Sequence, residues 1–208
     1  MWDIIFNHIS KRVIQKTSGG ILFNRRGFST ICRLIYGCGF FVLLGSEVQA
    51  GIKEDVEKVI RNQFGDSISL SMEKLVLDNN NKSAVEKKVH QRFVNDFIYV
   101  WTIKDDDSVK AYGLLDNVKG LSMPITFLVI YDPDGKILDT GVVKYREPYG
   151  GEIASPSWTA QFKGRNAKSN YAVGSEIDGI SGATISVYSM ATGVMKLSLL
   201  FPLIKSQL

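Results

Sequence analysis

Cysteine and histidine are scarce in this 208-residue sequence, which contains two of each. Cys32 and Cys38 both lie in the first fifty residues, so residues 51–208 contain no thiol. This absence excludes disulfides, iron–sulfur clusters, c-type haem and thiol catalysis from that part of the chain. His90 is the single histidine there, and its lysine-rich surroundings indicate a solvated surface side chain. No His/Cys cluster has metal-ligand spacing, so we expect no metal site.

An excess of charge of one sign is also missing from residues 51–208. The formal net charge of +4 arises in residues 1–50, where six basic side chains accompany two acidic ones. The rest of the chain carries 19 of each sign, which removes the electrostatic argument for nucleic-acid binding. P-loop, G-x-G-x-x-G and G-x-S-x-G motifs are absent, as are internal repeats. Nucleotide-binding loops of these types, serine-hydrolase elbows and solenoids are therefore excluded.

The first fifty residues are typical of an export leader. A basic stretch containing Arg25-Arg26 precedes twelve uncharged residues at 34–45, and a small-x-small pattern ends at Ala50. Twelve residues span about 18 Å as a helix, less than the bilayer core of about 30 Å. We therefore predict an export signal at 1–50, cleaved near Ala50, with a short uncleaved membrane anchor as the alternative. The arginine pair fits either a twin-arginine signal or an ordinary leader.

Hydrophobic periodicity predicts mixed helix and strand from residue 51 onward. An amphipathic helix is expected at 52–64, ended by Gly65, and a strand at 67–77. A loop at 79–81 and Ser83 as N-cap then predict a short helix at 84–93.

Strands dominate the centre of the sequence. We expect an antiparallel meander of four strands at 97–103, 109–118, 124–131 and 136–145, with turns at 105–108 and 132–135. An irregular segment at 146–178 then leads to a C-terminal helix at 184–200. The predicted fold is a single α+β domain, with residues 51–95 as its N-terminal helical and strand segment and residues 96–208 as its core.

The segment 178–184 (DGISGAT), just before the last helix, is the candidate functional site. Ser181 is a candidate N-cap, Gly182 and Ala183 leave the backbone open to a bulky group, and Thr184 is expected in the first helical turn. Free N–H groups and the positive end of the helix dipole favour a phosphate there, so the Thr184 hydroxyl is placed to carry a phosphoester. The alternative is a capped helix start built from small residues.

The pattern D-x-x-S-G-A-T resembles the attachment motif of the FMN-binding domain family. This family includes the C and G subunits of the sodium-pumping quinone reductase and of its ferredoxin-oxidising relative. Its threonine is joined to FMN by a phosphoester bond, which a flavin transferase makes from FAD with magnesium. The resemblance covers roughly residues 100–200. It implies that Thr184 is flavinylated and that Ser181, Gly182 and Ala183 form the turn that admits the phosphate.

A second stretch, after the strand at 136–145, also resembles the family. Family members have Glu-Thr-Pro-Gly there, whereas Pro148 follows Glu147 directly in this sequence. The resemblance implies that the flavin ring is lined by Glu147, Pro148, Tyr149, Gly150 and Gly151 and partly covered by Trp158. Taken by itself, this is a loop with aromatics, in which packing is the commoner role. A carboxylate near the ring disfavours the reduced anion, so Glu147→Gln is expected to shift the reduction potential.

The resemblance implies a periplasmic electron-transfer flavoprotein that carries covalent FMN on Thr184. A flavin transferase would load it, and it would relay electrons between a membrane-bound partner and a terminal acceptor. Because no catalytic residue set is evident, an electron carrier is favoured over a stand-alone enzyme. The alternatives are a reductase acting on a small substrate, with Glu147 or Tyr149 as proton donor, and an exported binding module without flavin. A closed flavin pocket would favour the reductase, and an exposed ring edge the carrier.

Overall fold

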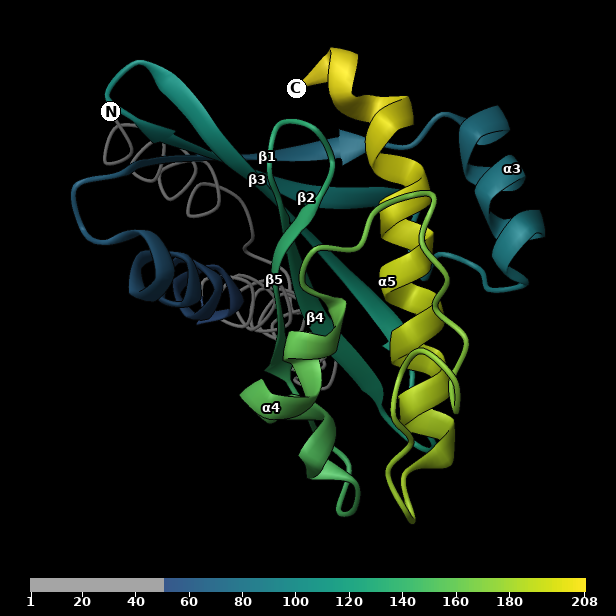
Figure 1. The fold of residues 1–208 in the computed structure, drawn as a ribbon. Coiled ribbons are helices and arrows are strands. Elements are labelled where there is room, and N and C mark those ends of the chain that lie inside the picture. The colour runs from purple at the N-terminus through teal and green to yellow at the C-terminus, as the bar shows by residue number, and fades with distance from the viewer. Residues whose placement is uncertain (1–50) are drawn as a thin grey trace, which may run out of the picture. The chain divides into compact units, whose positions relative to one another are not determined.

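A five-stranded antiparallel sheet with strand order β1-β2-β3-β4-β5 forms the centre of the structure (Figure 1). The computed structural model describes residues 51–208, and the predictions for the leader lie outside the described residues. The strands are β1 (Ser69–Val76), β2 (Phe97–Asp105), β3 (Ser108–Lys119), β4 (Pro124–Tyr131) and β5 (Ile137–Lys144). This order confirms the predicted meander, and the helices around the sheet confirm the α+β class.

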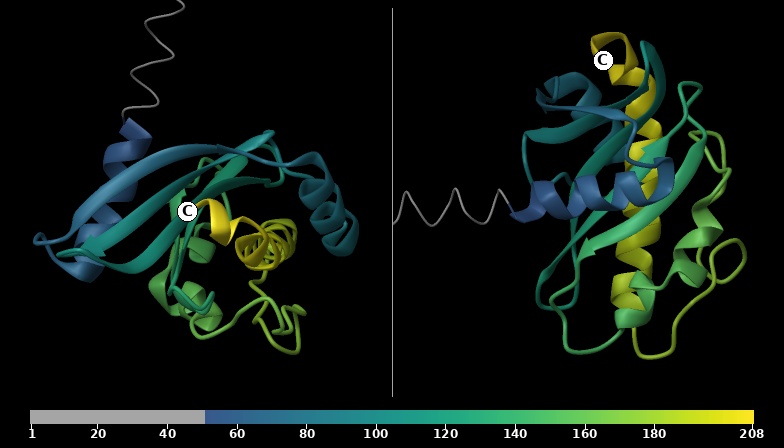
Figure 2. Two further views of the ribbon diagram at one scale, coloured as in Figure 1. Left: turned by 90° about the horizontal axis from the view of Figure 1, so that it is seen from above. Right: turned by 90° about the vertical axis from the view of Figure 1, so that its left-hand side faces the viewer.

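Helices cover both faces of the sheet, and the two views of Figure 2 show them on opposite sides. The helix at 51–64 packs through Val56 and Ile60 against one face. The other face carries α5 (Thr184–Ile204), which contributes most of the larger buried cluster. Because β4 is covered on both sides, its residues after Pro124 are all buried, and apart from Thr126 its sequence is apolar instead of alternating.

The helix at 51–64 ends as predicted. Gly65 has φ +87°, and its N–H donates to the Arg61 carbonyl at 2.8 Å. This left-handed conformation is readily adopted by glycine and stops the helix.

The next helix corrects a prediction. It is α3 (Asn79–Val89), not 84–93, and its N-cap is Asp78 instead of Ser83. Asp78 Oδ1 accepts from the N–H groups of Asn80 and Asn81, each at 3.0 Å. A carboxylate directly after β1 satisfies the first N–H groups of a helix, so the asparagines expected as a loop are its first turn. The helix ends at His90, which has φ 55°.

The C-terminal helix α5 begins at Thr184 as predicted but runs four residues beyond the predicted end, to Ile204. Pro202 lies inside it, where its missing N–H removes one hydrogen bond, while burial of Phe201 and Ile204 continues the helix. The stretch Thr184–Gln207 is long and apolar enough to cross a membrane, with a mean hydropathy of 1.5. In the most apolar 18 residues of this stretch, 61% is buried inside the fold, which fits the core helix of a domain.

At Gly193, α5 comes very close to the sheet. A Cβ at that position would lie 2.6 Å from Val118 Cγ1 and 2.9 Å from the Phe127 ring, which is closer than real side chains allow. The absence of a side chain at residue 193 therefore sets the distance between helix and sheet.

A buried ion pair also joins α5 to the sheet. Lys196 on α5 is fully buried, and its Nζ lies 2.9 Å from Oδ2 of the buried Asp116 on β3. The same ammonium group donates to the Arg92 carbonyl at 3.1 Å and lies 4.4 Å from the centre of the Phe93 ring. Burial raises the pKa of Asp116, although Lys196 acts in the opposite direction.

The segment between β5 and α5 is irregular with short helical pieces, as predicted. It contains η1 (Gly151–Ala154), α4 (Pro156–Thr159) and η2 (Ala160–Phe162). Arg165 holds the rest of the segment in place by donating to the carbonyl groups of Gln161, Asn170 and Glu176 at 2.6–2.9 Å. These bonds give a long connection a defined path.

Candidate functional site

A cavity of about 400 Å³ lies at the start of α5. Three segments that are distant in the sequence form its walls: the β3–β4 turn, the loop after β5, and the first residues of α5. The lining residues are Leu121, Ser122, Glu147, Pro148, Tyr149, Gly182, Ala183, Thr184, Ile185 and Ser186. Six of the ten residues predicted for the site therefore meet in one cavity.

Thr184 is the first residue of α5, and its side chain is exposed to solvent at this cavity. The residue before the helix, Ala183, has no side-chain hydrogen bond to the helix start. The first N–H groups of a helix lack acceptors within the helix, so here they remain available to an anion. A hydroxyl, free donors and the positive end of a helix dipole therefore come together at one point.

Ser181 was predicted as the N-cap, and the structure corrects this assignment. The cap position is Ala183, and Ser181 is exposed and outside the cavity lining. Gly182 separates them with φ +80°, so the backbone turns sharply before the helix, and a Cβ there would meet no atom within 4 Å. The turn places the residue-183 backbone, and not the serine hydroxyl, at the helix start.

Glu147 connects two walls of the cavity. Its Oε1 accepts from the N–H groups of Ser122 at 2.8 Å and Met123 at 3.0 Å, both in the β3–β4 turn. These hydrogen bonds favour the charged carboxylate and hold the pKa of Glu147 below its usual value. The carboxylate is thus used to hold the turn, a role that the sequence did not suggest.

Gly150 lies beneath the cavity instead of lining it. With φ +78°, it brings the loop after β5 so near to α5 that a Cβ would lie 2.7 Å from the Ala183 Cβ and 3.0 Å from the Tyr145 Oη. Tyr145 Oη in turn donates to the Tyr149 carbonyl. Gly151 begins η1, and a Cβ on it would meet nothing within 4 Å. Of the two glycines, Gly150 is the one that packing requires.

Trp158, predicted to cover the flavin ring, lies elsewhere. Its side chain is buried beside Phe162, with ring centres 5.4 Å apart, and it does not line the cavity. Its Nε1 donates to the Asp178 carbonyl at 2.9 Å, and Gln161 Oε1 accepts from the Asp178 N–H at 2.7 Å. Trp158 therefore anchors the segment that leads to Thr184 instead of contacting the cavity.

Exposed apolar side chains surround the cavity, which sequence reasoning missed. Tyr149 is 79% exposed and Leu121 62%. Ile185, which lines the cavity, is also exposed, as are Met123 and Tyr188, which do not line it but are near lining residues in the sequence. Solvent-exposed apolar side chains gathered at one site indicate a surface that binds an apolar group. The only sequence signal was the apolar pair Leu121 and Met123 within a turn between two strands.

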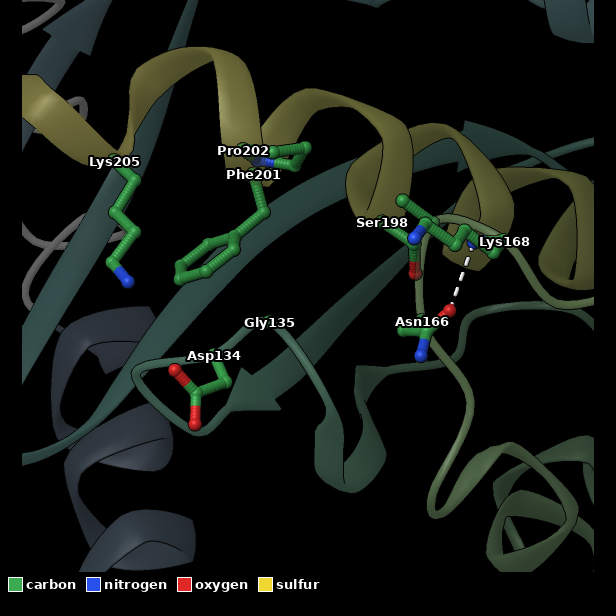
Figure 3. Close-up of a pocket in the computed structure, with 9 residues that line it drawn as sticks. Asp134, Gly135, Asn166, Lys168, Ser198, Phe201, Pro202 and Lys205 are labelled. Atoms are coloured by element: carbon green, nitrogen blue, oxygen red, sulfur yellow. Dashed lines mark hydrogen bonds between the residues drawn. The ribbon is translucent and has the colours of Figure 1, made fainter.

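A second cavity, of about 340 Å³, lies near the other end of α5 (Figure 3). Phe201 points from the helix toward the turn at Asp134 and Gly135, while Lys168 and Lys205 lie at its edges. No residue predicted for the site lies there. Among residues 51–208, no group of three or more His, Cys, Asp or Glu side chains is arranged to hold a metal ion.

The cavity at Thr184 fits a phosphate-bearing planar ligand by the chemistry of its donors. The uncapped helix start suits a phosphate, Gly182 leaves room for it, and the apolar rim suits a ring. Tyr149, which lines the cavity, is exposed to solvent.

Parts of the chain are similar to known proteins. Residues 120–197 match the model of the FMN-binding domain family. The C subunits of the Na(+)-translocating NADH-quinone reductase from Vibrio vulnificus strains YJ016 and CMCP6 are each 31% identical over 105 residues, which are 42% of this chain and 41% of each relative. The match thus spans less than half of these relatives. The crystal structure of Shewanella oneidensis NqrC is 18% identical, with a TM-score of 0.46, covering 71% of this chain and 86% of that one.

Proposed function

Because residues 120–197 match the model of the FMN-binding domain family, we propose that the chain is an exported electron-transfer flavoprotein with FMN bound covalently to Thr184. The observation that carries the proposal is the exposed hydroxyl of Thr184 at an uncapped helix start, inside a cavity with an apolar rim. FMN supplies the redox chemistry, since it accepts two electrons and releases them singly or in pairs. The protein binds, orients and partly shields it.

The proposed attachment step is a transfer of the FMN phosphoryl group from FAD to the Thr184 oxygen. A flavin transferase with magnesium would catalyse attack of the Thr184 oxygen on the FMN phosphorus of FAD. The new oxygen–phosphorus bond replaces the pyrophosphate bond, AMP leaves, and the hydroxyl proton is released to base. Afterwards the N–H groups at the start of α5 stabilise the phosphate, which remains negatively charged.

The open cavity supports an electron carrier over a closed reductase. Tyr149 on its rim is 79% exposed, and Glu147 is engaged by two backbone N–H groups, so neither resembles a buried proton donor. In this proposal a membrane-bound redox partner and a terminal acceptor exchange electrons with the flavin at the exposed rim. Covalent attachment suits a periplasmic site, where a dissociated flavin is lost.

The test is to replace the proposed attachment atom. Thr184→Val keeps the branched shape but removes the oxygen, so it should abolish covalent flavin with little effect on folding. Thr184→Ser should retain some attachment. Each variant is co-expressed with a flavin transferase and recovered from the periplasm. Mass spectrometry of the tryptic peptides should show the wild-type peptide heavier by one FMN less one water.

Two neighbouring serines are the controls. Ser181 is exposed beside the turn, whereas Ser186 also lines the cavity but is 4% exposed and lies about 200° from Thr184 around the helix axis. Ser181→Ala and Ser186→Ala should keep the added mass. Added mass on Thr184→Val, or its location at either serine, contradicts the assignment. A wild-type protein that carries no flavin after export contradicts the function.

A further inference from the structure

The turn between β3 and β4 forms a wall of the Thr184 cavity, and it is attached to the opposite loop by one carboxylate. We propose that Glu147 is a positioning residue: by holding this turn through its backbone, it sets the wall against which an FMN on Thr184 packs. We call the hydrogen bonds from Ser122 and Met123 to Glu147 Oε1 the Glu147 clamp. The inference rests on the proposed function but assigns to Glu147 a geometric role in addition to any effect of its charge.

The first argument is the geometry of the clamp. One oxygen accepts two successive backbone N–H groups, at 2.8 and 3.0 Å, from residues 24 and 25 positions earlier in the chain. Inside the turn, a single further bond runs from the Gly120 N–H to the Met123 carbonyl at 3.1 Å. The turn is therefore held in place mainly from outside, by the loop after β5.

The second argument is the tight approach at Gly120. A Cβ there would overlap Glu147 Oε1 and lie 2.6 Å from the Met123 carbonyl oxygen. Its φ is not in the left-handed region, so glycine is required at this position by the neighbouring carboxylate and the Met123 carbonyl and not by backbone conformation. Gly120 and Glu147 thus form one unit.

The third argument is the exposure of two apolar side chains on the turn that the clamp holds. Leu121 is 62% exposed and Met123 44%, although both are large apolar side chains. The clamp fixes the backbone of both residues, and Leu121 lines the cavity that contains Thr184. An apolar wall held by hydrogen bonds is suited to pack against a flat ring once the ring is tethered opposite.

Charge and geometry at residue 147 can be separated by three variants. Glu147→Gln removes the charge but keeps an oxygen that can accept from Ser122 and Met123 in place of Oε1. Gly120→Ala keeps the charge but expels the carboxylate from the turn. Glu147→Ala removes both. Gly141→Ala is the matched control, because its Cβ would meet only Val59, at 4.0 Å.

Amide hydrogen exchange of the flavin-free protein tests the clamp directly. Exchange at residues 122 and 123 should become about tenfold faster or more in Gly120→Ala and Glu147→Ala, because a hydrogen bond to a charged group is lost. It should stay near the wild-type rate in Glu147→Gln and Gly141→Ala. The double variant Gly120→Ala/Glu147→Ala should exchange no faster than Gly120→Ala alone, because the contact that Glu147→Ala removes is already lost there.

Iodide quenching of flavin fluorescence in the flavinylated protein tests the role of the wall. The quenching constant should rise in Gly120→Ala and Glu147→Ala, with Glu147→Gln and Gly141→Ala near the wild type. If Glu147→Gln behaves like Glu147→Ala while Gly120→Ala behaves like the wild type, charge alone acts and the inference is wrong. Unchanged exchange in Glu147→Ala also overturns it. A wild type without added FMN mass instead refutes the proposed function, and amide exchange still decides whether the clamp exists.

Discussion

Replacing the buried Lys196 by methionine should be the most destabilising single substitution that we consider. Methionine fills a similar volume, so the main effect is electrostatic. At 2.9 Å and an effective dielectric constant of about 20, the attraction to Asp116 is about 6 kcal/mol. Proton uptake by the unpaired Asp116 recovers part of this, so the expected loss is about 3–5 kcal/mol in the free energy of unfolding.

The pH dependence gives this prediction its sign. Burial already raises the pKa of Asp116, and removal of Lys196 should raise it further. A carboxyl group with a raised folded-state pKa binds more protons in the native state, so stability falls as pH rises between its unfolded and folded pKa. The deficit of Lys196→Met should therefore be smaller at about pH 5 than at about pH 7.5.

Urea denaturation at both pH values measures the effect, with Lys53→Met as the surface control. Lys53 is half exposed and lies 3.7 Å from Glu57, an i,i+4 pair that should contribute less than about 0.5 kcal/mol. The double variant Lys196→Met/Asp116→Asn should recover part of the loss, since no buried charge remains. A loss below about 1 kcal/mol at neutral pH, or a loss that grows on acidification, refutes the reasoning.

Two further predictions concern the candidate site. Gly150→Ala should destabilise the protein by about 2–4 kcal/mol, because φ +78° is unfavourable for alanine and the new methyl group overlaps Ala183; thermal unfolding measures this, and a neutral result contradicts the packing. The Glu147 clamp should contribute stability above the ordinary glutamate pKa and lose it as pH falls through the lowered pKa; amide exchange at Ser122, corrected for its intrinsic rate, should accelerate on acidification below that range, and a pH-independent corrected rate counts against the clamp.

Local signals in the sequence were sufficient for the meander. β4 begins at Pro124, which lacks an N–H, and ends before the turn at 132–135, so both of its limits are set by residues next to it. The start of α5 at Thr184 was equally local. In contrast, whether Asp78 or Ser83 is the N-cap depends on the residue at which β1 ends, and hydrophobic periodicity does not reveal that residue.

The candidate site was only partly predictable. The segment 182–184 and the loop at 147–149 could be associated by resemblance, but the wall at Leu121 and Ser122 could not. Its presence depends on hydrogen bonds from the backbone N–H groups of Ser122 and Met123 to a carboxylate about 25 residues later, and backbone donors have no residue-specific signature. Trp158 was misplaced for a similar reason, because a buried indole and a ring-covering indole have the same sequence pattern.

The close approach of α5 to the sheet at Gly193 links the packing of the helix to the position of its first residue, Thr184. Gly193 lies at the contact between helix and sheet, and Thr184 lies nine residues away, about 14 Å along the helix axis. Any side chain larger than hydrogen at residue 193 would push the middle of the helix away from Val118 and Phe127. The N-terminal part of α5 would then tilt. The Thr184 hydroxyl would move relative to the cavity walls that the β3–β4 turn and the loop after β5 form. The position of the Thr184 hydroxyl thus depends on a residue that does not line the cavity.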